Sequence, residues 1–149
     1  MQNEWRHGDY VLSTERSRLD LDVIHGFLTR SYWSPGIPRE TVERAIQHSL
    51  PFGLYFGASQ VGFARVITDF ASFGYLADVF VLEEHRGKGL SKWMMQVLFS
   101  HPQLQGFRRW MLATRDAHGL YRQVGFTSLA APERFMEKSV PDIYRRGPS

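Results

Sequence analysis

Hydrophobic residues recur with the spacing of an α-helix in two stretches near the start of the chain. The first begins at Asp20, which suits an N-cap, and the second at Pro38, which suits a first helical turn. The inward positions of the two stretches are Leu21, Ile24, Phe27 and Leu28, and then Val42, Ala45, Ile46 and Ser49. The segment WSPGIP between them contains two prolines and a glycine, which interrupt helices. Two short helices joined by a loop are therefore predicted.

From Pro51 onward the pattern changes to short runs of aromatic and β-branched residues, which are typical of strands. Two of these runs flank residues 57–60 and predict a β-hairpin. A third run, residues 74–82, is apolar on both faces, as expected of a central strand. The remaining segments with strand composition are residues 9–14, 107–114 and 133–140, and the sheet is expected to resume at Phe126.

Two more helices are predicted between these strands. The longer one covers residues 89–100, and its inward positions are Leu90, Met94, Val97 and Leu98. A short helix follows residue 115, and Gly125 suits the position just after its end. The predicted order is β-α-α-β-β-β-α-β-α-β, which mixes hairpins with β-α-β crossovers. It implies an α/β fold in the broad sense, with a mixed sheet and helices on both faces.

Length and composition indicate one domain over residues 1–149, with a tail that frays from about residue 141. The absence of cysteine excludes disulfides, thiolate metal sites and a cysteine nucleophile. The polar N-terminus lacks the apolar core of a signal peptide, and no apolar run approaches the ~20 residues of a membrane span. We therefore expect a cytoplasmic protein without a membrane partner.

Charge and histidine spacing argue against two further classes of function. The net charge is only +3, and the cations alternate with acids instead of forming a basic stripe, so nucleic acid is not an expected partner. The six histidines show no metal-ligand spacing, so no metal is expected either.

The segment EEHRGKGLSKW, residues 83–93, lies between the third apolar run and the start of a predicted helix. A helix N-terminus offers unpaired N–H groups, and the glycines at 87 and 89 allow an anion to approach them closely. Arg86 and Lys88 add positive charge, and Ser91 adds a hydroxyl. The segment suits a pyrophosphate, although Gly-x-Gly at such a junction is as often only a tight turn. The glycine orders of the P-loop and of the dinucleotide fingerprint are absent.

The motif Arg86-x-x-Gly89-x-Ser91 resembles the Gln/Arg-x-x-Gly-x-Gly/Ala signature of the GNAT family of N-acetyltransferases. The run DVFVLEEHRGKGL is similar to the fourth strand and pyrophosphate loop of that family, and ATRDAHGLYRQVGF to its second diagnostic segment. Two positions depart from the family pattern. Ser91 replaces a glycine or alanine, and Thr114 replaces an asparagine, which puts one polar contact in doubt.

The resemblance implies an enzyme that transfers an acetyl group directly from acetyl-CoA, without a metal, to the amine of a small molecule or amino-acid-like acceptor. It also implies a mostly antiparallel sheet, splayed between its fourth and fifth strands, where residues 77–81 and 110–114 hold the pantetheine arm. The implied cofactor-binding residues are Val79, Phe80, Val81, Arg86, Gly87, Lys88, Gly89, Leu90, Ser91, Thr114 and Tyr121. Two alternatives stay open: a non-catalytic acyl-CoA-binding or sensing module, and an acetyltransferase that modifies protein lysines or N-termini.

Tyr121 matches the tyrosine that protonates the departing thiolate in the family, and a phenol with a pKa of about 10 is able to donate at neutral pH. The alternative is a ring that only packs beside the cofactor. A backbone N–H near Phe80 or Val81 would polarise the thioester carbonyl. The residues considered as general bases are Asp78 and Glu83, with Glu84 less favoured, although acids before a helix also serve simply as favourable charges.

The acceptor pocket is expected between the loop of residues 31–38 and the turn at residues 70–73. Tyr32 and Trp33 would form an amphipathic wall, although Trp33 equally suits a place over the core. The other expected substrate contacts are Asp78 and Asp116, which would favour a cationic substrate, and His118. Both a monomer and a homodimer are compatible with the sequence.

Overall fold

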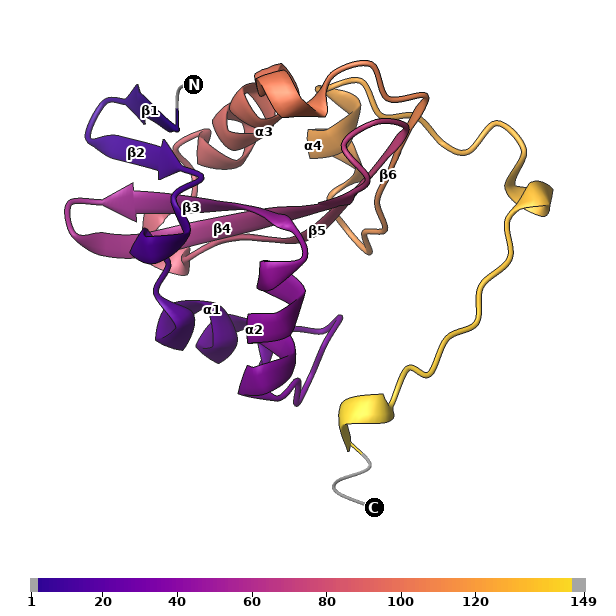
Figure 1. The fold of residues 1–149 in the computed structure, drawn as a ribbon, viewed down its shortest axis with the longest axis horizontal. Coiled ribbons are helices and arrows are strands. Elements are labelled where there is room, and N and C mark those ends of the chain that lie inside the picture. The colour runs from indigo at the N-terminus through magenta and orange to yellow at the C-terminus, as the bar shows by residue number, and fades with distance from the viewer. Residues whose placement is uncertain (1–2, 146–149) are drawn as a thin grey trace.

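A six-stranded sheet lies between two layers of helices in the computed structural model, which describes residues 3–145 (Figure 1). The strands are β1 (Glu4–His7), β2 (Tyr10–Ser13), β3 (Leu50–Phe56), β4 (Ser59–Thr68), β5 (Phe73–Val81) and β6 (Arg109–Met111). The helices are α1 (Leu21–Leu28), α2 (Arg39–Gln47), α3 (Leu90–Ser100) and α4 (His118–Arg122). α1 and α2 cover one face of the sheet and α3 and α4 the other, which confirms the predicted α/β architecture (Figure 1).

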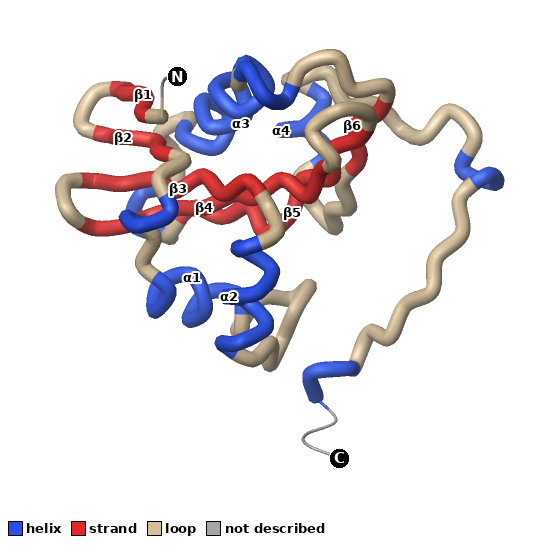
Figure 2. The backbone as a smooth tube through the Cα atoms, viewed as in Figure 1, coloured by secondary structure: helices blue, strands red, loops and turns tan. Residues whose placement is uncertain are grey.

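The sheet follows the order of the chain, β1-β2-β3-β4-β5-β6. All neighbours are antiparallel except β5 and β6, which run parallel because α3 crosses between them. Residues Phe73–Tyr75 pair with Arg109–Met111, and the two strands do not pair beyond this short contact. The predicted split between these two strands is therefore present, and Figure 2 shows the short β6 beside β5.

Local sequence features account for several of the boundaries. The carboxylate of Asp20 accepts hydrogen bonds from the N–H groups of Asp22 and Val23, so it caps α1 as predicted. Pro38 precedes the first residue of α2, where its missing N–H removes no helical hydrogen bond. Gly57 adopts a positive φ of 60° in the predicted hairpin turn between β3 and β4.

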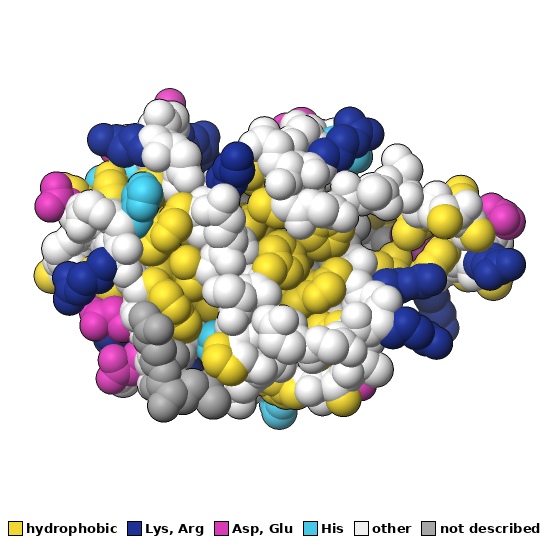
Figure 3. Space-filling view, turned by 90° about the horizontal axis from the view of Figure 1, so that it is seen from above, with side chains coloured by type: hydrophobic (Ala, Val, Ile, Leu, Met, Phe, Trp, Pro, Cys, Tyr) yellow, Lys and Arg dark blue, Asp and Glu magenta, His cyan; other side chains and the backbone are white. Residues whose placement is uncertain are grey.

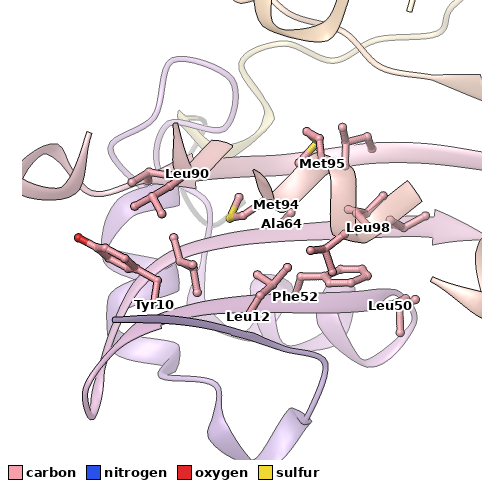
Figure 4. Close-up of a cluster of buried hydrophobic side chains, with 14 of the residues drawn as sticks. Tyr10, Leu12, Leu50, Phe52, Ala64, Leu90, Met94, Met95 and Leu98 are labelled. Atoms are coloured by element: carbon pink, nitrogen blue, oxygen red, sulfur yellow. The ribbon is translucent and has the colours of Figure 1, made fainter. Parts of the chain in front are cut away.

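Two hydrophobic clusters hold the layers to the sheet. On one face α3 packs against β2, β3 and β4, and Figure 4 shows Leu90, Met94, Met95 and Leu98 facing Leu12, Phe52 and Ala64. On the other face the second cluster joins α1 and α2 to the sheet through Ile24, Leu28, Val42, Ile46, Phe63 and Phe80. The split in the sheet is thus supported by a packed core on each side.

The prediction was wrong about strands at both ends of the chain. Residues 126–145 contain two 3-10 turns and no strand, and Figure 1 shows this segment leaving the sheet beyond α4. A run of strand-like residues forms a strand only where a partner edge lies beside it, which composition alone does not reveal. Conversely, β1 was not predicted, because its residues are mostly exposed and show no alternation of buried and exposed positions. β1 is a strand because it pairs with β2.

The C-terminal tail returns to the body near the loop that joins α1 to α2. Tyr144 is half-buried and packs against the second cluster, although fraying was expected from about residue 141. Residues 146–149, the remainder of that expected segment, lie outside the described residues.

Charges of both signs are dispersed around the rim of the face that carries α3 and α4, with hydrophobic side chains between them (Figure 3). Among the helices formed by residues 3–145, none has the length and apolar character needed to cross a membrane.

Candidate active site

A cavity of about 430 Å³ lies where β5 and β6 diverge. Ala77, Asp78 and Val79 line it from β5, and residues 112–114 line it from the segment after β6. A second cavity of about 310 Å³ shares the lining residues Leu112, Ala113, Thr114 and Tyr121 with the first. The wall between the two cavities therefore contains Tyr121 and the chain that leaves β6.

Backbone hydrogen bonds before and after α4 fix the position of Tyr121. The hydroxyl of Thr114 accepts a hydrogen bond from the N–H of Ala117 at 3.1 Å, just before α4 begins. After α4, Gly125 adopts a φ of 99° and the N–H of Phe126 donates to the Tyr121 carbonyl at 3.0 Å. The predicted use of Gly125 as the residue that ends this helix is confirmed.

The Tyr121 side chain is 8% exposed, and its ring packs edge-on against Phe126 at 5.9 Å between centroids. Burial raises the pKa of its phenol to about 12, and the neighbouring Tyr32 adds to the shift. Within residues 3–145 no group forms a hydrogen bond with the Tyr121 hydroxyl. The phenol is therefore protonated at neutral pH, and its proton is available for donation into the cavity.

A β-bulge in β5 sets the position of Asp78. Phe80 pairs with Phe63 and Ala77 with Arg65, so Asp78 and Val79 together face the single residue Ala64. Asp78 has a φ of 56°, a conformation that aspartate tolerates better than most residues. The bulge interrupts the regular alternation of β5, and the Asp78 carboxylate contacts Arg65 on β4.

Both carboxylate oxygens of Asp78 have partners. Arg65 Nε donates to one oxygen at 2.6 Å, and Trp33 Nε1 donates to the other at 2.8 Å. The ion pair is largely enclosed, with side-chain exposures of 16% for Arg65 and 11% for Asp78. Arg65 also donates to the Ser49 hydroxyl at 2.9 Å, so the network ties the end of α2 to β4, β5 and the Trp33 loop. These contacts favour a positioning role for Asp78 over that of a general base.

Replacing Asp78 with asparagine separates the two roles, because asparagine also tolerates a positive φ. We expect the free energy of unfolding to fall by about 2 kcal/mol, since Arg65 loses a charged partner. We expect the KM for the acceptor to rise while the pH dependence of kcat keeps its shape. Urea denaturation and steady-state kinetics measure these effects. A loss of kcat of about 100-fold together with a changed pH profile would instead identify Asp78 as the base.

In the predicted anion loop, residues 86–89 are exposed where α3 begins, whereas the Leu90 side chain is buried in the core. Gly87 and Gly89 have φ values of 79° and 74°, and no atom lies within 4 Å of a Cβ built on either. No side chain caps α3, and its first turn carries no acid, so its N–H groups and partial positive charge are available.

The start of the loop is anchored to the body of the protein. The Tyr10 hydroxyl and His85 Nδ1 form a hydrogen bond of 2.7 Å, and Arg86 Nε donates to the Val81 carbonyl at 2.8 Å. Arg86 thus holds the loop in addition to providing charge, whereas Lys88 is fully displayed on the surface. The donor set and the open glycines fit a diphosphate group.

The other predicted acids, Glu83, Glu84 and Asp116, do not lie together in the structure. Glu83 and Glu84 lie exposed in a 3-10 turn and line neither cavity, so the structure does not bring them to Tyr121. Asp116 lines the first cavity but is exposed and forms an ion pair with Arg115 at 3.6 Å.

The remaining predicted contacts divide between the cavities and the core. Tyr32 and Trp33 line the first cavity, and His118 lines the second. Val79 lines the first cavity, whereas the Phe80 ring is buried and stacks on Phe27 at 4.1 Å. Val81, also buried, belongs to the cluster beneath α3.

One segment expected on the acceptor side lies away from both cavities. The turn at residues 70–73 lines neither cavity, and Ile67 and Tyr75, in the adjacent strands, form this wall instead. Arg65 and Tyr144 were missed. A single arginine within the apolar run of β4 was a usable indication for Arg65, whereas nothing local to Tyr144 marks it as a cavity residue. Among residues 3–145, no three histidine or carboxylate side chains gather as a metal site would require.

Comparisons with known proteins agree with this geometry. A family model described as the acetyltransferase (GNAT) domain matches residues 51–128. A Gibberella zeae protein, FG08082, whose name marks it as a candidate acetyltransferase, is 36% identical over 140 residues, with 78% of each chain covered.

Solved structures extend the similarity. A GNAT-family protein from Xanthomonas campestris pv. campestris is 51% identical, with a TM-score of 0.89 over 93% of this chain and 97% of its own. A Clostridium acetobutylicum protein solved with acetyl-CoA is 14% identical, with a TM-score of 0.63 over 87% of this chain and 94% of its own. The second similarity is one of fold alone.

Proposed function

Because the chain belongs to the GNAT family of acetyltransferases and is therefore an acyltransferase, we propose that it transfers the acetyl group of acetyl-CoA to the amine of a small molecule. The observation that carries this proposal is the protonated, buried phenol of Tyr121 in the wall of a cavity between two diverging strands. A thiolate leaving group in that cavity would meet a proton donor without a competing hydrogen-bond partner.

The donor substrate would be held at two places. The N–H groups of Gly87 to Ser91 at the start of α3 would bind its diphosphate, with Lys88 adding charge. The diverging edges of β5 and residues 112–114 would bind its pantetheine arm, because the backbone groups exposed by the split need hydrogen-bond partners.

The reaction forms a bond between the acceptor nitrogen and the acetyl carbon and breaks the thioester C–S bond. A backbone N–H of Phe80 or Val81 would stabilise the charge that develops on the carbonyl oxygen. Tyr121 would give its proton to the departing sulfur, and the proton lost from the nitrogen would go to water and then restore the phenol. No carboxylate is assigned as the base, because the Asp78 oxygens are engaged and Glu83 lies outside the cavities.

A small acceptor is supported by the lining of the first cavity. Tyr32, Trp33 and Tyr144 line one side of this partly open pocket of about 430 Å³, which gives a small acceptor several surfaces to contact. A panel of small amines, tested by release of free CoA thiol, checks the proposal. A protein that transfers acetyl only to polypeptide lysines or N-termini, or that binds acetyl-CoA and transfers to nothing, would contradict it.

The pH dependence follows from the two protons in this scheme. The pKa of Tyr121 is raised from 10.0 to about 12, so the acid remains protonated throughout the alkaline range in which amines lose their proton. We expect kcat/KM to rise with pH up to the pKa of the acceptor amine and then to remain level to about pH 10.5. Profiles measured with two amines of different pKa should shift accordingly. A decline near pH 9, common to both amines, would contradict this assignment.

A further inference from the structure

The acceptor side of the first cavity is built mainly from aromatic rings. Tyr32 and Trp33 come from the loop after α1, Tyr75 from β5 and Tyr144 from the C-terminal tail, while Ile67 adds an aliphatic surface from β4. The Tyr32 and Trp33 rings meet edge to face, with 5.0 Å between their centroids. This wall offers flat apolar surface in several orientations.

The tail is fixed against the loop that carries two of these rings. A Cβ built on Gly36 would lie only 2.9 Å from the Tyr144 carbonyl oxygen, and Gly36 has a φ of 81°. The loop and the tail therefore approach as closely as a glycine allows. Tyr144 also packs against the second hydrophobic cluster, which keeps its ring at the cavity.

The charged groups inside this wall are already compensated. Arg65 and Asp78 neutralise each other at 2.6 Å, and the Trp33 indole N–H is also bound to Asp78. Arg65 also binds the Ser49 hydroxyl. A carboxylate or phosphate that entered here would lose water and gain no free cation within the described lining.

The charges at the rim are paired in the same way. The Arg115 guanidinium lies 3.9 Å from the centre of the Tyr32 ring and within 3.6 Å of the Asp116 carboxylate. The backbone N–H of Arg115 donates to the Tyr32 hydroxyl at 3.0 Å, which helps to hold that ring at the cavity. The rim thus presents a ring-stacked ion pair, with 65% of the Arg115 side chain and 67% of the Asp116 side chain exposed.

From this lining we infer that the acceptor is a primary amine attached to an apolar, flat body, such as an arylalkylamine, and that it carries no carboxylate or phosphate. The inference rests on the proposed acetyl transfer and specifies its substrate class. The ring of the acceptor would stack within the wall formed by Tyr32, Trp33 and Tyr75. The amine would reach between Tyr121 and Val79, where β5 and the segment after β6 diverge.

Three amines test the class. 2-Phenylethylamine and phenylalanine differ only in the carboxylate, and glucosamine replaces the flat apolar body with a hydroxylated ring. We expect kcat/KM for 2-phenylethylamine to exceed that for each of the others by about 10- to 100-fold, because a buried unpaired polar group is penalised. Equal or higher values for phenylalanine or glucosamine would overturn the inference and leave acetyl transfer to small amines standing. No transfer to any amine, with acetyl-CoA still bound in calorimetry, would overturn the proposed function itself.

Substitutions of Trp33 provide a second test of the acceptor class. We expect Trp33→Ala to raise the KM for 2-phenylethylamine about 10-fold and to change the KM for acetyl-CoA by less than about twofold. Trp33→Phe is the matched variant, since it retains a ring but lacks the N–H that binds Asp78, and it should preserve most of the affinity. A KM for 2-phenylethylamine that is unchanged in Trp33→Ala would overturn the assignment of this wall.

Discussion

Replacing Tyr121 with phenylalanine is expected to lower kcat by about 100- to 1,000-fold, because the departing thiolate loses its proton donor. The KM for acetyl-CoA should change little, since the aromatic ring remains in the wall of the cavity. Folding should be preserved, because the lost hydroxyl has no hydrogen-bond partner within residues 3–145. Steady-state kinetics and thermal denaturation measure the two effects separately.

Tyr55→Phe provides the matched control. Tyr55 is also a buried tyrosine whose pKa is raised to about 12 by burial, and its hydroxyl likewise has no hydrogen-bond partner among the described residues, but it lines neither cavity. Removal of the Tyr55 hydroxyl should therefore leave kcat unchanged. If Tyr121→Phe retained full kcat with every accepted amine, Tyr121 would be a packing residue, and the thiolate would have to take its proton from water.

The second large effect is expected at the start of α3. Gly89→Val places a β-branched residue at a φ of 74°, which strains the loop and displaces the N–H groups that would bind the diphosphate. We expect the KM for acetyl-CoA to rise about 10- to 100-fold, because charge-assisted hydrogen bonds to the anion are lost. Calorimetric titration with CoA measures the same loss without turnover.

Gly106→Val separates backbone strain from loss of the anion site. Gly106 has a φ of 80° and, like Gly89, no atom within 4 Å of a Cβ, but it lies outside the loop before α3. Both variants should lose comparable stability, and only Gly89→Val should lose affinity for CoA. Equal affinities in the two variants would show that the glycine loop does not bind the diphosphate.

The parts of the site that follow from local sequence were predictable. Hydrophobic spacing located α3, and the glycines at 87 and 89 indicated an uncapped, open helix start, which the structure confirms. Gly125 and the residues before it indicated α4, the short helix that contains Tyr121. Each of these depends on backbone preferences that act over a few residues.

The acceptor side depended on contacts between distant segments, and it was predicted only in part. A bulge of one residue turned Asp78 toward Arg65, and no local pattern distinguishes a bulged strand from a regular one of this length. Arg65 contacts Asp78 of β5 and Ser49 after α2, and Tyr144 reaches the cavity from the far end of the chain. Such placements follow from tertiary packing, which periodicity does not encode.

The predicted final strand shows the same limit. Residues 133–140 have the composition of a strand, yet within the described chain no strand pairs with them. A strand forms only when its backbone pairs with a neighbouring strand, and that neighbour cannot be deduced from the residues of one segment.

A crystal structure with CoA bound tests the central claim most directly. We expect the diphosphate against the N–H groups of Gly87 to Ser91, the pantetheine arm between β5 and residues 112–114, and the sulfur within hydrogen-bonding reach of the Tyr121 hydroxyl. A diphosphate bound elsewhere on the protein, or a sulfur remote from Tyr121, would contradict both the donor site and the catalytic acid.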